Sequence, residues 1–154
     1  MSQGKTGLRG RKGARGALVA TALAATAVLA GSPAYAATND SFSAWTTGGG
    51  CGMLEFVDYG PGAPGGGDND DYLVIHDYCA DGYGVRAYAW LNGYYLGTKY
   101  NGNGLAGSAV VWDPYKPYGN VYPGDYVDIE VCLVNGSNGS PVKCGAAQRT
   151  SVDG

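Results

Sequence analysis

The strongest constraint on the fold is a nine-residue stretch, 126–134, in which apolar and polar side chains alternate one by one. Its apolar positions are Val127, Ile129, Val131 and Leu133, and the positions between them are Asp128, Glu130 and Cys132. A period of two is typical of a β-strand that buries one face and exposes the other. No window after residue 36 keeps apolar residues at the 3.6-residue spacing of an amphipathic helix, so we expect an all-β domain.

Further short runs rich in Val, Tyr and Trp are separated by Gly, Pro, Asn and Asp, which is the pattern of strands joined by turns. We expect these strands at 53–59, 72–79, 85–91, 94–100, 105–112 and from about Val142 onward. In the third of them, Val85, Ala87, Ala89 and Leu91 would face the core. Asn92-Gly93 predicts a two-residue type I′ turn, because both residues tolerate a positive φ. Six to seven strands in about 100 residues predict a small antiparallel β-sandwich, Ig-like or jelly-roll-like.

The first 36 residues predict a secretory signal peptide. Five basic residues precede an Ala/Val/Leu run over 17–30, and the small-x-small sequence Ala34-Tyr35-Ala36 follows. The run of about 14 residues is shorter than the roughly 20 that a membrane span requires. We therefore expect cleavage after Ala36 and a secreted, extracellular protein.

Removal of this segment would leave a strongly acidic chain. All 13 acidic residues lie after residue 36 but only five basic ones do, giving a formal charge of −8. Phosphate backbones and anionic membrane surfaces repel such a domain, so we expect neither a nucleic-acid nor a membrane partner.

Four cysteines, Cys51, Cys79, Cys132 and Cys144, all follow the predicted signal peptide. An even count in a small exported domain indicates two disulfides, and three pairings are open. The turn-rich run 135–140 favours Cys132–Cys144 across a hairpin, which would leave Cys51–Cys79. A zinc site is disfavoured, since the chain has no Cys-x-x-Cys and one histidine.

Residues 37–50 differ in composition from the β domain expected over 51–154. Phe42 and Trp45 stand among Ser, Thr, Asn and Asp, and Gly48-Gly49-Gly50 follows. We expect a flexible N-terminal arm whose two aromatic side chains dock on their own domain or, by preference, on a partner.

Tyrosines supply the other candidate binding residues, and twelve of the thirteen follow residue 36. The sequence Pro114-Tyr115-Lys116-Pro117-Tyr118 predicts an extended polyproline-like segment with both tyrosines on one face, and Tyr122 follows soon after. Tyr94 and Tyr95 come directly after the Asn-Gly turn. Tyrosine with Gly, Asn and Ser is typical of binding surfaces; the alternative is that these rings fill the outer faces of a thin sandwich.

Catalytic and metal motifs are weak. His76-Asp77-Tyr78-Cys79 resembles the His-Asp-x-Cys run of secreted phospholipases A2, but its flanks predict a strand where that family has a helix. Asp68, Asp70 and Asp71 could offer oxygen ligands to calcium, yet Leu73 and Cys79 stand where an EF-hand needs Gly and Glu. No Gly-x-Ser-x-Gly elbow occurs. We expect a protein that is not an enzyme and has no cofactor.

An Ala-rich export signal, a short arm and a small disulfide-bonded β domain follow one another here. This order resembles the adaptor subunits of actinobacterial umbrella toxin particles. The resemblance implies a protein that joins a lectin subunit to a large spoke protein and inserts residues 37–50 into a partner. A second hypothesis is a module that binds polysaccharide or cell wall, with Tyr115, Tyr118, Tyr122 and Trp112 as sugar platforms. A third is an inhibitor of a secreted hydrolase.

Overall fold

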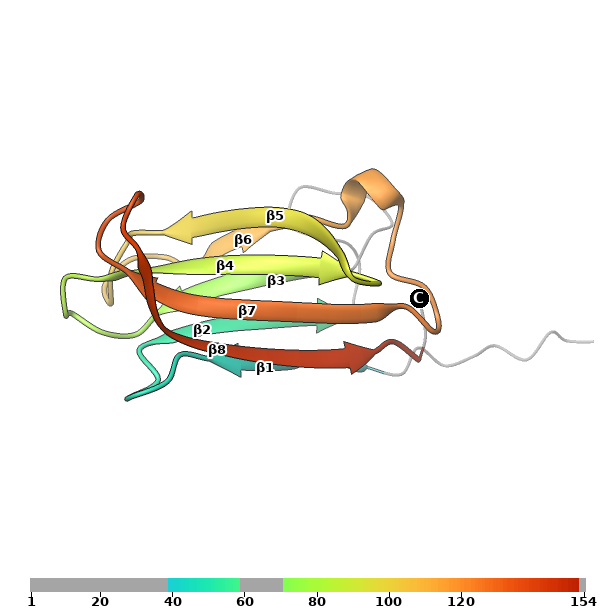
Figure 1. The fold of residues 1–154 in the computed structure, drawn as a ribbon, viewed down its shortest axis with the longest axis horizontal. Helices are drawn as coiled ribbons and strands as arrows, with labels where there is room; N and C mark the ends of the chain where they lie inside the picture. The colour runs from blue at the N-terminus through green and yellow to red at the C-terminus, as the bar shows by residue number, and fades with distance from the viewer. Residues whose placement is uncertain (1–38, 59–70, 153–154) are drawn as a thin grey trace, which may run out of the picture. The chain divides into compact units, whose positions relative to one another are not determined.

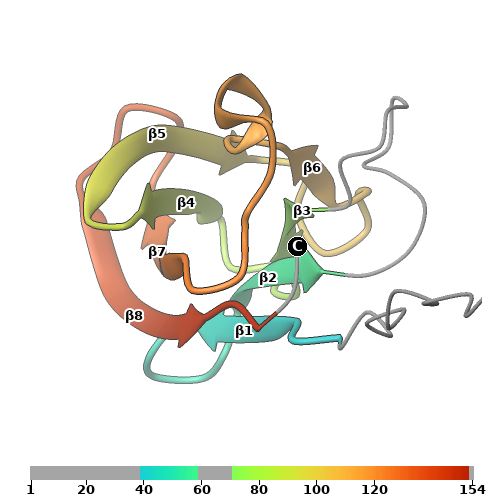
Figure 2. The ribbon, with the colours of Figure 1, turned by 90° about the vertical axis from the view of Figure 1, so that its right-hand side faces the viewer.

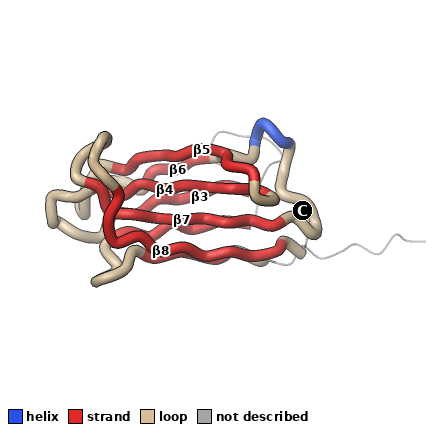
Figure 3. The backbone as a smooth tube through the Cα atoms, viewed as in Figure 1, coloured by secondary structure: helices blue, strands red, loops and turns tan. Residues whose placement is uncertain are grey.

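The computed structural model of the chain describes residues 39–58 and 71–152, and within these ranges strands dominate, with one short helical turn (Figure 3). The described elements are β1 (Phe42–Trp45), β2 (Gly52–Asp58), β3 (Asp71–Asp77), β4 (Gly84–Leu91), β5 (Tyr94–Asn101), β6 (Val110–Trp112), the 3-10 helix η1 (Lys116–Tyr118), β7 (Tyr126–Val134) and β8 (Pro141–Thr150). The predicted fold class is confirmed. The described part has eight strands rather than six to seven, and it holds no helix long and apolar enough to cross a membrane.

Two four-stranded antiparallel sheets face each other. Their strand orders are β1-β2-β3-β6 and β5-β4-β7-β8. The chain crosses from the first sheet to the second between β3 and β4, returns for β6, and crosses again to β7 (Figure 1). Seen end-on, β8 of the second sheet lies beside β1 of the first (Figure 2). This arrangement is a sandwich.

The core is built from alternate residues of each strand, as the period of two predicts. In β4 and β7 the predicted inward positions are buried, and Val85, Ala87, Ile129 and Val131 have no exposed surface. The first sheet contributes larger apolar side chains at the same depth. These are Leu54, Phe56, Leu73 and Ile75.

Both expected disulfides form. Cys51–Cys79 ties the start of β2 to the end of β3, and Cys132–Cys144 ties β7 to β8 across the hairpin whose turn is 135–140. The type I′ turn is confirmed by φ values of 52° at Asn92 and 81° at Gly93. Beyond it, Trp90 pairs with Tyr95 while Ala89 pairs with Gly97. Leu96 is therefore the extra residue of a β-bulge, and it packs against the core.

The strand predicted at 105–112 is wrong over its first half. Only Val110–Trp112 pairs with β3, and Leu105 is exposed. Before β6 the backbone closes a tight loop instead, in which the Gly107 N–H donates to the Gly104 carbonyl and Asn103 Nδ2 donates to the Ser108 carbonyl. Local side-chain bonds of this kind compete with strand pairing.

The prediction of a flexible arm is wrong for residues 42–45, which form β1 and pair with β2 from Phe42↔Phe56 to Trp45↔Met53. The Phe42 ring is partly buried, 5.4 Å from Phe56 between centroids. The apolar ring thus docks on its own domain, which was one of the two options that the sequence left open.

A seam between β1 and β8 holds this strand in place. The Thr47 N–H donates to the Lys143 carbonyl at 2.9 Å, and Arg149 Nη1 donates to the Asp40 and Ser41 carbonyls. Gly145 lets the two backbones approach, because a Cβ atom there would overlap the carbonyl oxygen of Trp45. The seam joins the two sheets along one side of the sandwich.

We expect Gly145→Ala to lower the free energy of unfolding by about 2 kcal/mol, because the added methyl group forces β1 away from β8. Urea denaturation of the purified protein measures the change. Ala146→Gly, at the exposed neighbouring position of the same strand, is the control and should cost about 0.5 to 1 kcal/mol through backbone entropy alone. Equal losses in the two variants would contradict a close seam at Gly145.

Candidate binding surface

The predicted partner-binding residues separate into exposed and buried side chains. Five are exposed to solvent by roughly half or more: Trp45 (48%), Tyr94 (76%), Tyr95 (53%), Tyr118 (58%) and Tyr122 (54%). The other two, Phe42 and Tyr115, lie against the core.

Tyr115 is a correction to the predicted binding face. The segment is not extended: Asp113 Oδ1 accepts the N–H groups of Tyr115 at 3.0 Å and Lys116 at 2.9 Å, and this turn leads into η1. The turn directs Tyr115 inward, where its ring meets Phe56 edge-on with 5.7 Å between centroids. Burial raises the pKa of its phenol well above the usual range. Tyr118 is left pointing outward on the other side of the turn.

Trp112 is also excluded as an exposed sugar platform. It is partly buried against the core, and its indole lies 3.7 Å from the position that a Cβ atom of Gly97 would occupy. The sugar-binding set that the sequence suggested is therefore not one surface, since two of its four members pack inward.

The β4–β5 turn, η1 and the start of β7 lie at one end of the sandwich (Figure 1). In sequence, these segments hold or adjoin three exposed tyrosines. Tyr94 and Tyr118 line a hollow of about 310 Å³ together with Leu91, Asn92 and Leu96. The Tyr122 hydroxyl lies 3.0 Å from the position of a Cβ atom on Gly119, so this ring folds back over the residue after Tyr118. We call Tyr94, Tyr118 and Tyr122 the tyrosine end.

Asn92 fastens the two loops that carry these tyrosines. Its Nδ2 donates to Asp125 Oδ1 at 2.7 Å, and its Oδ1 accepts the Tyr126 N–H at 2.8 Å. The other oxygen of Asp125, Oδ2, accepts the Tyr122 N–H at 2.9 Å. The loops are thus held in one arrangement by their own side chains. The sequence identifies Asn92 as a turn residue, but nothing local shows that it bonds a residue 33 positions away.

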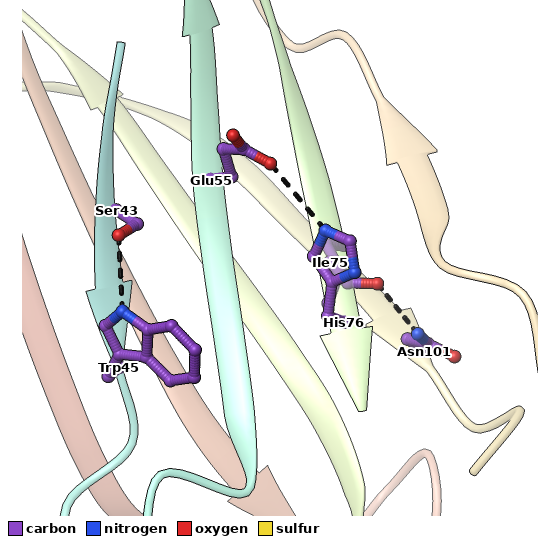
Figure 4. A network of polar contacts seen from close by, with 6 residues as sticks. All are labelled: Ser43, Trp45, Glu55, Ile75, His76 and Asn101. Carbon is purple, nitrogen blue, oxygen red and sulfur yellow. Dashed lines mark hydrogen bonds and ion pairs between the residues drawn. The ribbon is translucent and has the colours of Figure 1, made fainter. Parts of the chain in front are cut away.

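A second aromatic group lies on the outer face of the first sheet. The rings of Trp45 and Tyr78 stack at 5.8 Å, and those of Tyr78 and His76 at 5.4 Å. His76 Nε2 lies 3.7 Å from Glu55 Oε2, and Trp45 Nε1 donates to Ser43 Oγ (Figure 4). We call Trp45, Tyr78 and His76 the aromatic row. Its assembly depends on β1 joining the sheet, which the sequence did not predict.

The first two residues of the phospholipase-like run, His76 and Asp77, end β3, as the flanks predict, and the run does not lie on a helix. Strand alternation directs His76 outward and Asp77 inward. Asp77 is buried, and its Oδ1 accepts the Cys79 N–H at 3.3 Å. Burial, with a smaller contribution from the charge of Asp81, raises the pKa of Asp77 above the ordinary value.

Of the calcium candidates, Asp68 and Asp70 lie outside the described residues. Asp71 begins β3, is buried, and accepts the Val121 N–H at 2.8 Å. Within the described ranges, the close sets of three possible ligands each contain two cysteines that are bonded to each other as a disulfide.

The fold and these surfaces define a class: a small disulfide-linked antiparallel β-sandwich that exposes aromatic side chains at one loop end and on a sheet face. No protein-family model, curated protein or solved structure matches the chain. What the domain does is therefore inferred from its surfaces.

We expect Asn92→Gly to loosen the tyrosine end without destroying the turn. Glycine accepts the φ of 52° but lacks the amide that bonds Asp125 and Tyr126. The free energy of unfolding should fall by about 1 to 2 kcal/mol, and the Tyr126 amide should exchange with solvent faster in NMR. Asn138→Gly, in the turn at the opposite end, is the matched control and should leave the Tyr126 amide unchanged. Unchanged exchange in Asn92→Gly would contradict the fastening role.

Proposed function

We propose that this protein is a secreted, non-catalytic module that binds another extracellular macromolecule through its tyrosine end. The observation that carries the proposal is the fastening of the β4–β5 turn to the segment before β7 by Asn92 and Asp125, with Tyr94, Tyr118 and Tyr122 exposed around it. Tyrosine offers a large contact area with few rotatable bonds. When its backbone is already ordered, less conformational entropy is lost on binding.

A protein is the partner that this surface fits best. The hollow between Tyr94 and Tyr118 is lined mostly by apolar and aromatic side chains, with Asn92 as its one amide, so an apolar side chain with a polar neighbour would fill it. Central apolar contacts with a polar rim are typical of protein–protein interfaces.

Secretion is supported by the predicted signal peptide and by the two disulfides, which persist in oxidising compartments. The resemblance to toxin-particle adaptors gives the proposal a specific form, a subunit that joins two larger ones. The proposal does not include insertion of residues 37–50 into a partner, because β1 pairs within its own sheet and is held by the seam to β8. In this form the tyrosine end replaces the arm as the partner contact.

Partner recovery from culture supernatant tests the proposal. We expect Tyr94→Ala combined with Tyr118→Ala to lower recovery of the bound partner by about tenfold or more, as loss of buried aromatic anchors does at other interfaces. Tyr83→Ala is the control, since Tyr83 is 40% exposed in the loop before β4, at the opposite end. If the double variant retains the same partner as fully as the control does, the tyrosine end is not the binding surface.

Carbohydrate binding is a second candidate, and the aromatic row is the observation that favours it. Trp45 and Tyr78 expose 48% and 43% of their surface on a sheet face, beside His76 and Glu55. Aromatic faces stack on sugar rings, while imidazole and carboxylate groups can bond hydroxyls.

We expect Trp45→Ala to lower retention on insoluble polysaccharide or purified cell wall if this candidate holds, because the variant removes the most exposed ring of the row. A sedimentation assay measures it. The Tyr94→Ala, Tyr118→Ala protein is the matched control, which should be retained normally. Retention that is lost in the tyrosine variant and kept in Trp45→Ala would reject the aromatic row as a sugar platform.

A further inference from the structure

The outer face of the second sheet carries a different combination of side chains. Tyr88 and Trp90 project from β4, and their rings are 6.3 Å apart and nearly parallel. Tyr95 of β5 extends the group, with its ring 5.3 Å from that of Trp90. The Asn92-Gly93 turn sets this contact, because it pairs Leu91 with Tyr94 and Trp90 with Tyr95.

Two carboxylates lie directly beside these rings. In the β4–β7 register, Tyr88 pairs with Glu130 and Trp90 pairs with Asp128. Directly opposite residues of an antiparallel pair have Cβ atoms about 4.5 to 5.5 Å apart, so each carboxylate adjoins one ring. We call Tyr88, Trp90, Tyr95, Asp128 and Glu130 the aromatic–acidic face.

No basic side chain of the described residues pairs with either carboxylate. The ion pair found within those ranges joins His76 to Glu55 on the other sheet. Arg86 shares the outer face of β4, but it pairs with Cys132 in the register and its Nη2 donates to the Ser137 carbonyl. The negative charge beside Tyr88 and Trp90 is thus left for a ligand.

We propose that the aromatic–acidic face binds an extended segment of a protein partner that carries Lys or Arg at alternate positions. A cation over an aromatic face is attracted by the ring electrons, and a neighbouring carboxylate adds to this attraction. Asp128 and Glu130 are two residues apart on one strand, which is the spacing of side chains that point to the same side of an extended chain. Two basic residues separated by one would therefore meet one carboxylate and one ring each. After residue 36 the chain has 13 acidic and five basic residues, and this negative charge attracts such a segment from a distance.

This surface is separate from the tyrosine end, and the inference does not require the proposed function to hold. The tyrosine end lies at one end of the sandwich, on the first residue of β5 and on the segment between β6 and β7, whereas Tyr88, Asp128 and Glu130 lie in the middle of strands. If both surfaces are occupied, the domain would join two partners.

The test is a titration of the full secreted protein with a synthetic peptide, acetyl-Gly-Lys-Gly-Arg-Gly-amide, followed by NMR of the Trp90 indole N–H. The same peptide with Gln in place of Lys and Arg is the control ligand. We expect the basic peptide to shift the Trp90 signal in a saturable way that weakens with added salt, because the carboxylates are exposed to solvent screening. The Gln peptide should cause no shift.

Substitutions inside and outside the aromatic–acidic face locate the site. Asp128→Asn combined with Glu130→Gln should weaken binding of the basic peptide by about fivefold or more, through loss of two charge pairs. Trp90→Ala, followed through the Tyr88 backbone amide, should weaken it by about threefold or more. Asp81→Asn, which neutralises an exposed carboxylate in the loop before β4, should leave the affinity unchanged. The Tyr94→Ala, Tyr118→Ala protein should also bind the peptide normally, which separates this inference from the proposed function.

The inference would be overturned by no shift of Trp90 at millimolar peptide, by equal binding of the Gln peptide, or by wild-type affinity in the Asp128→Asn, Glu130→Gln protein. A stronger and saturable response to choline chloride than to the peptide would also overturn it, because the face would then serve a small quaternary ammonium ligand and not a protein segment.

Discussion

The narrow space between the two sheets determines which side chains of the second sheet face the core. β4 illustrates the constraint: its inward positions are Val85, Ala87, Ala89 and Leu91, and its outward positions include Tyr88 and Trp90. Packed sheets stand about 10 Å apart, so the second sheet fills its half of the core with small and medium apolar side chains. Most aromatic rings of β4 and β5 are then left outside. The exposed aromatic surfaces are therefore a consequence of how the core is packed.

The two ends of the sandwich are held by different kinds of bond. Both disulfides lie toward the end where β3 and β7 finish and β4 and β8 begin. The tyrosine end, at the other side, is held by hydrogen bonds: those of Asn92 to Asp125 and Tyr126, and a backbone pair between the Gly124–Asp125 turn and Ser151. The disulfides hold one end by covalent bonds, whereas each hydrogen bond at the tyrosine end contributes about 1 kcal/mol to stability. The proposed recognition surface is thus at the end whose conformation depends on hydrogen bonds between particular side chains and the backbone.

This difference explains how much the sequence could predict. Strand alternation, the Asn-Gly turn and the hairpin around 135–140 are local patterns, and the fold class, the inward faces of β4 and β7 and the disulfides came from them. β1 was missed because it is only four residues long and lies among Ser, Thr, Asn and Asp; pairing with β2 and the seam to β8 make it a strand. Tyr115 was assigned to the surface because proline spacing suggests an extended chain. Instead, Asp113 accepts backbone N–H groups in a turn that directs Tyr115 inward. Whether this turn forms depends on the core against which the Tyr115 ring packs. The aromatic row and the Asn92–Asp125 bond join residues far apart in the sequence.

The β4–β5 hairpin connects the tyrosine end to the aromatic–acidic face. Tyr94 and Tyr95 are consecutive, so strand alternation sends their rings to different sides. One lines the hollow with Tyr118, and the other contacts Trp90. The two-residue turn sets this arrangement, because it pairs Leu91 with Tyr94 and Trp90 with Tyr95. The bulge that follows adds the Leu96 side chain to the core. One hairpin therefore serves the core and both surfaces, and the domain presents its two candidate contacts in a fixed relation to each other.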